Sequence, residues 1–108
     1  MITVKELKAR FERDSVSYRW GSIASDLLRI ANLRSSASFN AKSYESVLTE
    51  VKLFTEWLGP NLDLDKQKII ISLQRQLSEW SFLPISKDVL EKDARRWSRK
   101  ILKVSELI

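Results

Sequence analysis

The chain of 108 residues contains no cysteine and no histidine. Without cysteine it can form no disulfide, no thiolate nucleophile and no iron–sulfur cluster. Without histidine it lacks imidazole acid–base catalysis, nearly all zinc sites and the Glu-x-x-His type of di-iron site. The serines likewise have no histidine to activate them. We therefore expect no enzyme, no bound metal and no cofactor.

Glycine, proline and long apolar runs are also scarce. Two glycines and two prolines are few for a sheet protein with many tight turns. The longest uninterrupted apolar run covers only 69–71, which is far too short to span a membrane. The first six residues contain no apolar signal region. From this we expect a cytoplasmic protein with no transmembrane segment.

The residues that are present favour a compact helical fold. Apolar residues make up 44% of the chain, four of them are tryptophans, and good helix formers dominate the composition. The length suits one domain, residues 1–108. The fold class that we predict is all-α: a small antiparallel up-and-down bundle of four main helices plus a short N-terminal helix.

Capping residues and apolar spacing predict where these helices begin and end. A capping box at Thr3 and Glu6 starts the short helix, which ends near Arg13. The expected longer helices start at Asp14 or Ser15, at Asn40 or Ser43, at Asp63 or Asp65, and at Ser86. The first two end near Arg34 and at Leu58, and the third ends before Pro84. Phe39 is expected to anchor the longest loop, and Gly59 to end its helix in a left-handed conformation before Pro60.

The helix expected over 65–80 is apolar on two sides. One arc holds Ile69, Ile70, Leu73, Leu77 and Trp80, and a second side holds Leu64, Ile71 and Phe82. A helix with two apolar sides is usually covered on both. The pattern therefore predicts that this helix lies at the centre of the bundle.

The helix expected over 15–34 has a polar side that includes Ser22, Ser25, Asp26 and Arg29. Its Gly21 indicates either close packing, where a neighbouring helix needs room beside Trp20, or else a bend or a ligand contact. Glu50 and three other carboxylates of the chain fall on polar arcs, where we expect them to be solvated.

Two features could carry a function. The first is apolar surplus beyond a single core stripe, at Leu53, Trp57, Ile71 and Phe82. These side chains would form a surface for a protein partner or a second copy, unless neighbouring helices or the Phe39 loop cover them. The second is a basic face on the last helix, formed by Lys92, Arg95, Arg96, Arg99, Lys100 and Lys103. Such a face could bind a phosphate backbone or anionic lipid, or it could simply be solvated.

Several segments together resemble a known group of proteins. They are the run from Arg19-Trp20-Gly21 to Ile30, the run 50–57 that ends at Trp57, the later Trp80, and the run 94–102 that contains Trp97. This set resembles a group of small, uncharacterised cyanobacterial proteins with an Arg-Trp-Gly segment and later spaced tryptophans. The resemblance spans most of the chain and implies a compact helical protein of a photosynthetic bacterium, without implying an activity.

The sequence thus leads to two hypotheses. The preferred one is a non-enzymatic module that binds another protein or itself through the surplus apolar side chains. The alternative is a binder of nucleic acid or of another anionic surface, which would use the basic face of the last helix.

Overall fold

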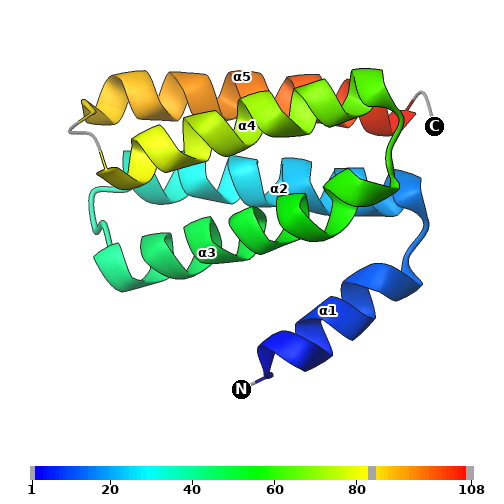
Figure 1. Cartoon of the computed structure of the whole chain (residues 1–108). Helices are drawn as coiled ribbons and strands as arrows, with labels where there is room; N and C mark the ends of the chain where they lie inside the picture. The colour runs from blue at the N-terminus through cyan, green and yellow to red at the C-terminus, as the bar shows by residue number, and fades with distance from the viewer. Residues whose placement is uncertain (1, 83–84, 107–108) are drawn as a thin grey trace.

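The computed structural model describes residues 2–82 and 85–106, and this part of the chain is built from helices without a strand. The helices are α1 (Val4–Arg13), α2 (Val16–Ser35), α3 (Ala41–Leu58), the short 3₁₀ turn η1 (Gly59–Asn61), α4 (Leu64–Phe82) and α5 (Lys87–Glu106). Figure 1 shows α2 to α5 as four long helices whose successive members run in opposite directions, with α1 set apart beside α3. The predicted all-α fold, four main helices with a short N-terminal one, is confirmed. The third long helix was expected to end before Pro84, which lies outside the described residues; α4 is described as far as Phe82.

Short polar side chains begin all five α-helices. In each case the side-chain oxygen of the capping residue accepts a hydrogen bond of 3.0–3.3 Å from the amide three residues later. This bond satisfies one of the amides that a helix start leaves without a partner. The caps are Thr3, Ser15, Asn40, Asp63 and Ser86.

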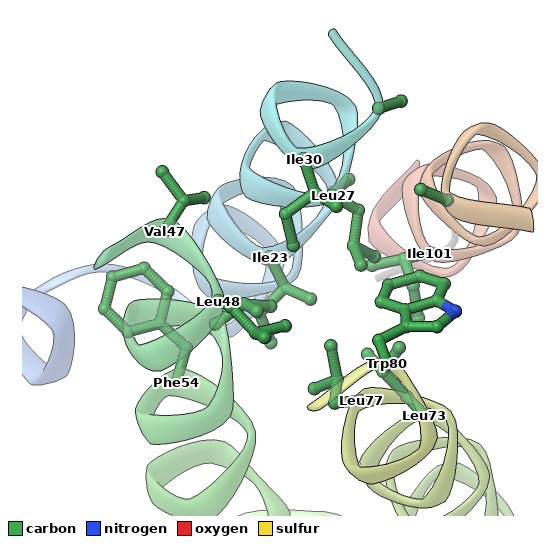
Figure 2. Close-up of a cluster of buried hydrophobic side chains, with 14 of the residues drawn as sticks. Ile23, Leu27, Ile30, Val47, Leu48, Phe54, Leu73, Leu77, Trp80 and Ile101 are labelled. Carbon is green, nitrogen blue, oxygen red and sulfur yellow. The ribbon is translucent and has the colours of Figure 1, made fainter. Parts of the chain in front are cut away.

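Helix α2 lies at the centre of the bundle. Its apolar side is fully buried, with Trp20, Ile23, Leu27 and Ile30 all inaccessible to solvent. Figure 2 shows Ile23, Leu27 and Ile30 directed into a core to which α3, α4 and α5 also contribute. The most central helix is therefore α2. The two-sided apolar pattern of α4 had predicted that α4 would be central, and that prediction is wrong.

Small side chains bring α2 and α5 close together. Ser98 Oγ donates to the carbonyl of Ala24 at 2.7 Å. Nearer the end of α5, Ser17 Oγ donates to the Ser105 carbonyl at 2.8 Å, and Ser105 Oγ donates to the Ser17 carbonyl at 2.7 Å. A Cβ on Gly21 would lie 3.8 Å from Ser105 Oγ, an ordinary contact, so the packing does not require glycine there. The close approach therefore depends on serine and alanine.

Helix α4 buries only one of its two apolar sides. Ile70, Leu73, Leu77 and Trp80 lie in the core. The second side, with Leu64, Ile71 and Phe82, is exposed. Helix α1 packs on α3 and leaves this side uncovered. Phe11 of α1 lies against α3 with its ring stacked 4.4 Å from that of Phe54. The expectation that α4 is covered on both sides is wrong.

The conformation predicted for Gly59 is wrong, whereas the role predicted for Phe39 agrees with its contacts. Gly59 has φ −50° and ψ −50°, so it is right-handed and not left-handed as expected. Its amide still bonds to the carbonyl of Thr55, and the chain continues into the 3₁₀ turn with Pro60 in its first positions. Phe39 does anchor the α2–α3 loop: its ring meets that of Tyr44 edge-on at 5.7 Å, and the Arg34 guanidinium lies 4.8 Å from its centre.

Candidate interaction surface

An apolar stripe lies on the outer side of α4. Leu64 is 75% exposed, Ile71 is 55% exposed and Phe82 is 83% exposed. They are spaced by 7 and 11 residues, which places them on one side of a helix. The buried side chains of α4 lie roughly opposite on the same helix. We call Leu64, Ile71 and Phe82 the α4 stripe.

The stripe has one charged edge and one uncharged edge. Arg75, Lys68 and Glu79 are all exposed, about 40°, 60° and 80° round the helix from Ile71 on the same side. Glu79 accepts a hydrogen bond of 3.1 Å from Gln76, and neither Lys68 nor Glu79 forms an ion pair within the described part of the chain. Glutamine side chains line the other edge.

An open cleft of about 360 Å³ lies on that uncharged edge, beside Ile71. It is formed where α3, η1 and α4 meet, and its lining mixes apolar with polar groups. The lining residues are Thr55, Glu56, Gly59, Pro60, Gln67, Ile70, Ile71 and Gln74. A side chain of a partner could therefore enter next to the stripe.

Of the four residues predicted to form a partner surface, only Ile71 and Phe82 belong to this stripe. Trp57 is half-buried, with its ring 6.0 Å from that of Phe11 on α1 and 6.0 Å from that of Phe54. Leu53 is half-buried as well. The structure thus assigns Trp57 to an aromatic cluster between α1 and α3.

Lys52 lies on the side of α3 that faces α4. Its ammonium contacts Ser81 Oγ and lies 5.8 Å from the centre of the Phe82 ring. Leu53 and Trp57 are rotated about 100° and 140° from Lys52 around α3. Leu53 and Trp57 on α3 therefore lie away from the side that faces α4, whereas Ile71 and Phe82 lie on α4 itself. The four predicted residues form no single patch.

The predicted basic face lies along α5, but two of its arginines have partners of their own. Arg95 bonds to Glu91 at 3.1 Å and to Asn32 of α2 at 3.0 Å. Arg96 bonds to Asp93 at 2.9 Å. These contacts neutralise part of the charge.

The other four cations of this face are exposed. Lys92, Arg99 and Lys103 are exposed and form no ion pair within the described residues. Lys100 is exposed too, with its ammonium 5.0 Å from the centre of the Trp97 ring, a cation–π arrangement. A basic strip thus remains, narrower than the sequence predicts.

Sequence reasoning missed a buried carboxyl at the contact between α2 and α3. Asp26, expected on the polar side of its helix, is only 4% exposed. Its Oδ1 lies 3.3 Å from Arg29, which also lies 3.7 Å from Glu50 of α3. Its Oδ2 is buried without a partner as long as both carboxyls are ionised.

Burial raises the pKa of Asp26 from 3.8 to about 8, helped by a hydrogen bond to Glu50 and by the negative charge of Glu50, and opposed by Arg29. The folded protein therefore favours the protonated form of Asp26, whose hydroxyl can donate to Glu50, so Glu50 lies beside another carboxyl and is not simply solvated. The signal in the sequence was that Asp26 lies next to Ile30 and Ile23 on the helical wheel, at the edge of the apolar arc.

This acid pair borders an open cleft of about 600 Å³ over the outer side of α2. Its lining includes the small residues Gly21, Ser22 and Ser25 of α2. The pair can take up or release one proton near neutral pH. No group of three or more histidine, cysteine, aspartate or glutamate residues that could hold a metal ion occurs within residues 2–82 and 85–106.

Comparison of the chain with family models, with curated proteins and with solved structures finds no match. The resemblance to small cyanobacterial proteins therefore stays a prediction. Across the described ranges, no helix is both long enough and apolar enough to cross a membrane.

Proposed function

We propose that this protein is a non-enzymatic interaction module that binds a protein surface through the α4 stripe. The observation that carries the proposal is the exposure of Leu64, Ile71 and Phe82 along one side of a single helix. Aligned apolar side chains with a polar rim are typical of protein interfaces, where an aromatic residue is a favoured anchor. A cytoplasmic location, as expected from the sequence, is part of this proposal.

The energetics favour a moderate affinity. Fully burying one such side chain contributes about 1.5–3 kcal/mol, so the three give roughly 5–9 kcal/mol before costs. Association itself costs on the order of 4–15 kcal/mol. The polar edges and the cleft beside Ile71 would therefore have to contribute as well, and a reversible complex is expected.

Site-specific photo-cross-linking in native lysate tests the proposal. A photoreactive residue replaces Ser78, which lies on α4 between Ile71 and Phe82, and in a control variant it replaces the exposed Thr49 of α3. We expect protein adducts from position 78 that exceed those from position 49. Equal labelling from both positions would contradict a stripe interface.

Matched substitutions make the result specific to the stripe. Ile71→Gln and Phe82→Gln should reduce the adducts from position 78, because each removes apolar surface from the stripe. Leu102→Gln on α5 is the control, since Leu102 is 47% exposed and lies on another helix. If Leu102→Gln has the same effect as the stripe variants, the adducts do not depend on the stripe.

The second candidate function is binding of nucleic acid or another anionic surface by α5, and it is supported by the exposed strip of Lys92, Arg99 and Lys103. Binding to phosphate should weaken steeply as salt rises, because each cation releases counterions. Binding through an apolar stripe should tolerate salt. The double variant Arg99→Glu, Lys103→Glu should abolish the anionic mode and leave the stripe mode intact.

A further inference from the structure

We infer that α1 is a strap that opens from α3 and closes again while α2–α5 stay folded, and that its opening uncovers an aromatic face of α3. This face consists of Phe54 and Trp57, which α1 covers through Phe11 in the closed structure. It is a different surface from the α4 stripe, so the inference does not depend on the proposed function.

Very little buried surface attaches α1 to the bundle. Phe11 is the one buried residue of α1 and Leu7 is half-buried, while the rest of this helix is exposed. Within residues 2–82 and 85–106, the other buried apolar side chains come from α2, α3, α4 and α5. Figure 1 shows α1 apart from these four long helices. Because segments with few buried apolar contacts open at a low free energy, α1 should open far more often than the core.

The seam between α1 and the bundle is also incompletely packed. An open cleft of about 430 Å³ lies between α1, α2 and α3. Leu7 and Phe11 of α1 line this cleft together with Tyr18 of α2 and Phe54 of α3. Side chains that border open space lack dispersion contacts on that side. The attachment of α1 is therefore weaker than the packing between the four long helices.

Helix α2 begins without help from α1. Asp14 and Ser15, which connect the two helices, are both extended. Ser15 Oγ accepts a hydrogen bond of 3.2 Å from the Tyr18 amide and so caps α2. This cap involves no atom of α1. Opening can therefore be confined to α1 and its connection to α2.

Once open, α1 is too short to remain a stable helix. It has ten residues, and isolated helices shorter than about 12–15 residues are marginal in water. Opening therefore unfolds α1, and closing orders it again on α3. For this reason, hydrogen exchange of the α1 amides reports how often the strap opens.

Arg19 of α2 holds the end of α1 in the closed state. Its Nε donates to the carbonyl of Asp14 at 2.9 Å, and its Nη2 donates to the carbonyl of Glu12. Its guanidinium carbon also lies 5.9 Å from the centre of the Phe11 ring. The carbonyls at the end of a helix carry partial negative charge, which favours a cation there. Loss of Arg19 should therefore favour the open state.

Native-state hydrogen exchange of the full chain, read by mass spectrometry, tests whether α1 opens by itself. Amides 8–13 of α1 should be protected on the order of a hundredfold less than amides 23–30 of α2. Ile101→Val, a mild substitution in the core, should lower the protection of the α2 amides by up to about tenfold and leave that of α1 unchanged. If the protection of α1 falls by the same factor, α1 opens only when the whole chain unfolds, and the inference is overturned.

Removal of the Arg19 side chain tests how the strap is held. Arg19→Ala should lower the protection of α1 about tenfold, because two hydrogen bonds to its last carbonyls are lost. Arg10→Ala is the matched control, since Arg10 is an exposed arginine of α1 that forms no hydrogen bond or ion pair among the described residues. An equal loss of protection in both variants would contradict the role of Arg19.

A proline in α1 tests what the opening uncovers. Ala9→Pro lies in the helix interior and should favour the open state about a hundredfold without touching Phe54 or Trp57. Lys5→Pro is the control, because the first turn of a helix tolerates proline. Hydroxyl-radical labelling should rise several-fold at Trp57 in Ala9→Pro alone, and it should stay low at the core residues Trp20 and Trp80.

Two outcomes of the proline experiment would overturn the strap. The first is unchanged labelling of Trp57 in a variant whose α1 amides have lost protection, which would show that opening does not uncover the aromatic face. The second is a loss of protection throughout α2–α5 in Ala9→Pro, which would show that the bundle needs α1 to fold.

Discussion

The buried carboxyl of Asp26 should make the stability of the fold depend on pH. Its pKa is raised from 3.8 to about 8 in the folded protein, first by burial and then by Glu50. Between these two values the unfolded chain releases a proton that the folded chain retains. The free energy of unfolding therefore falls as pH rises from about 4 to about 8 and levels off above that.

The magnitude follows from the linkage between proton binding and folding. The contribution is about 1.4 kcal/mol for each pH unit within this window, so at pH 7 the retained proton costs on the order of 4 kcal/mol of stability. Asp26→Asn removes the cost and keeps the shape: the amide oxygen can accept from Arg29 and the amide nitrogen can donate to Glu50. We expect Asp26→Asn to stabilise the protein by about 4 kcal/mol at pH 7 and to have almost no effect near pH 4.

Urea unfolding at several pH values between about 4 and 8 measures this difference. The fluorescence of Trp20 and Trp80, both buried in the core, reports the transition. Asp63→Asn is the control, because Asp63 is exposed and its pKa is lowered, mainly by its hydrogen bond from the Lys66 amide. Asp63→Asn should slightly lower the free energy of unfolding above about pH 4, which is opposite in sign to the effect of Asp26→Asn. The reason is that a carboxylate whose charged form is favoured in the folded state stabilises the fold at higher pH.

Two results would refute the reasoning about Asp26. The first is a gain from Asp26→Asn that stays the same across the whole pH range, which would point to packing and not to ionisation. The second is a loss of stability at pH 8. Either would mean that the folded state holds the Asp26 carboxylate ionised at neutral pH.

Three further predictions concern packing and backbone conformation, and urea unfolding checks each. Gly21→Ala should stabilise by up to about 1 kcal/mol, because alanine favours the helix interior and its Cβ meets only an ordinary contact; destabilisation would mean that α5 approaches more closely. Gly59→Ala should also be tolerated or mildly stabilising, since right-handed backbone suits alanine and its Cβ lies 3.4 Å from Ile70; a clear loss would indicate strain at that contact. Trp57→Ala should lower the free energy of unfolding by about 3 kcal/mol, because it removes a ring from the aromatic cluster. An unchanged urea midpoint together with weakened partner binding would instead show that Trp57 belongs to the interface.

The helices and their starting points could be predicted from the sequence because they depend on neighbouring residues. A hydroxyl, amide or carboxylate three residues before a free amide is enough to cap a helix, and Thr3 and Ser86 do so as expected. The buried stripe of each helix also follows from its own spacing. Chain direction and the order of the helices are then constrained by short connections.

The environment of the site residues could not be predicted, because it depends on which helix covers which side. Trp57 and Ile71 looked alike as surplus apolar residues, yet α1 covers the first and nothing within the described residues covers the second. Asp26 looked like a surface residue until α3 placed Glu50 beside it. The same spacing is compatible with either outcome.

By itself, the sequence determined that this is an all-α chain of four long helices and a short one, with caps and core stripes at the expected residues. Only the tertiary structure decided that α2 and not α4 is central, that α4 keeps an apolar side exposed, and that Asp26 is buried. The physical reason is one of range. Capping and helical periodicity act within one or two turns of chain, whereas burial, and with it charge state and surface, depends on contacts between residues far apart in sequence.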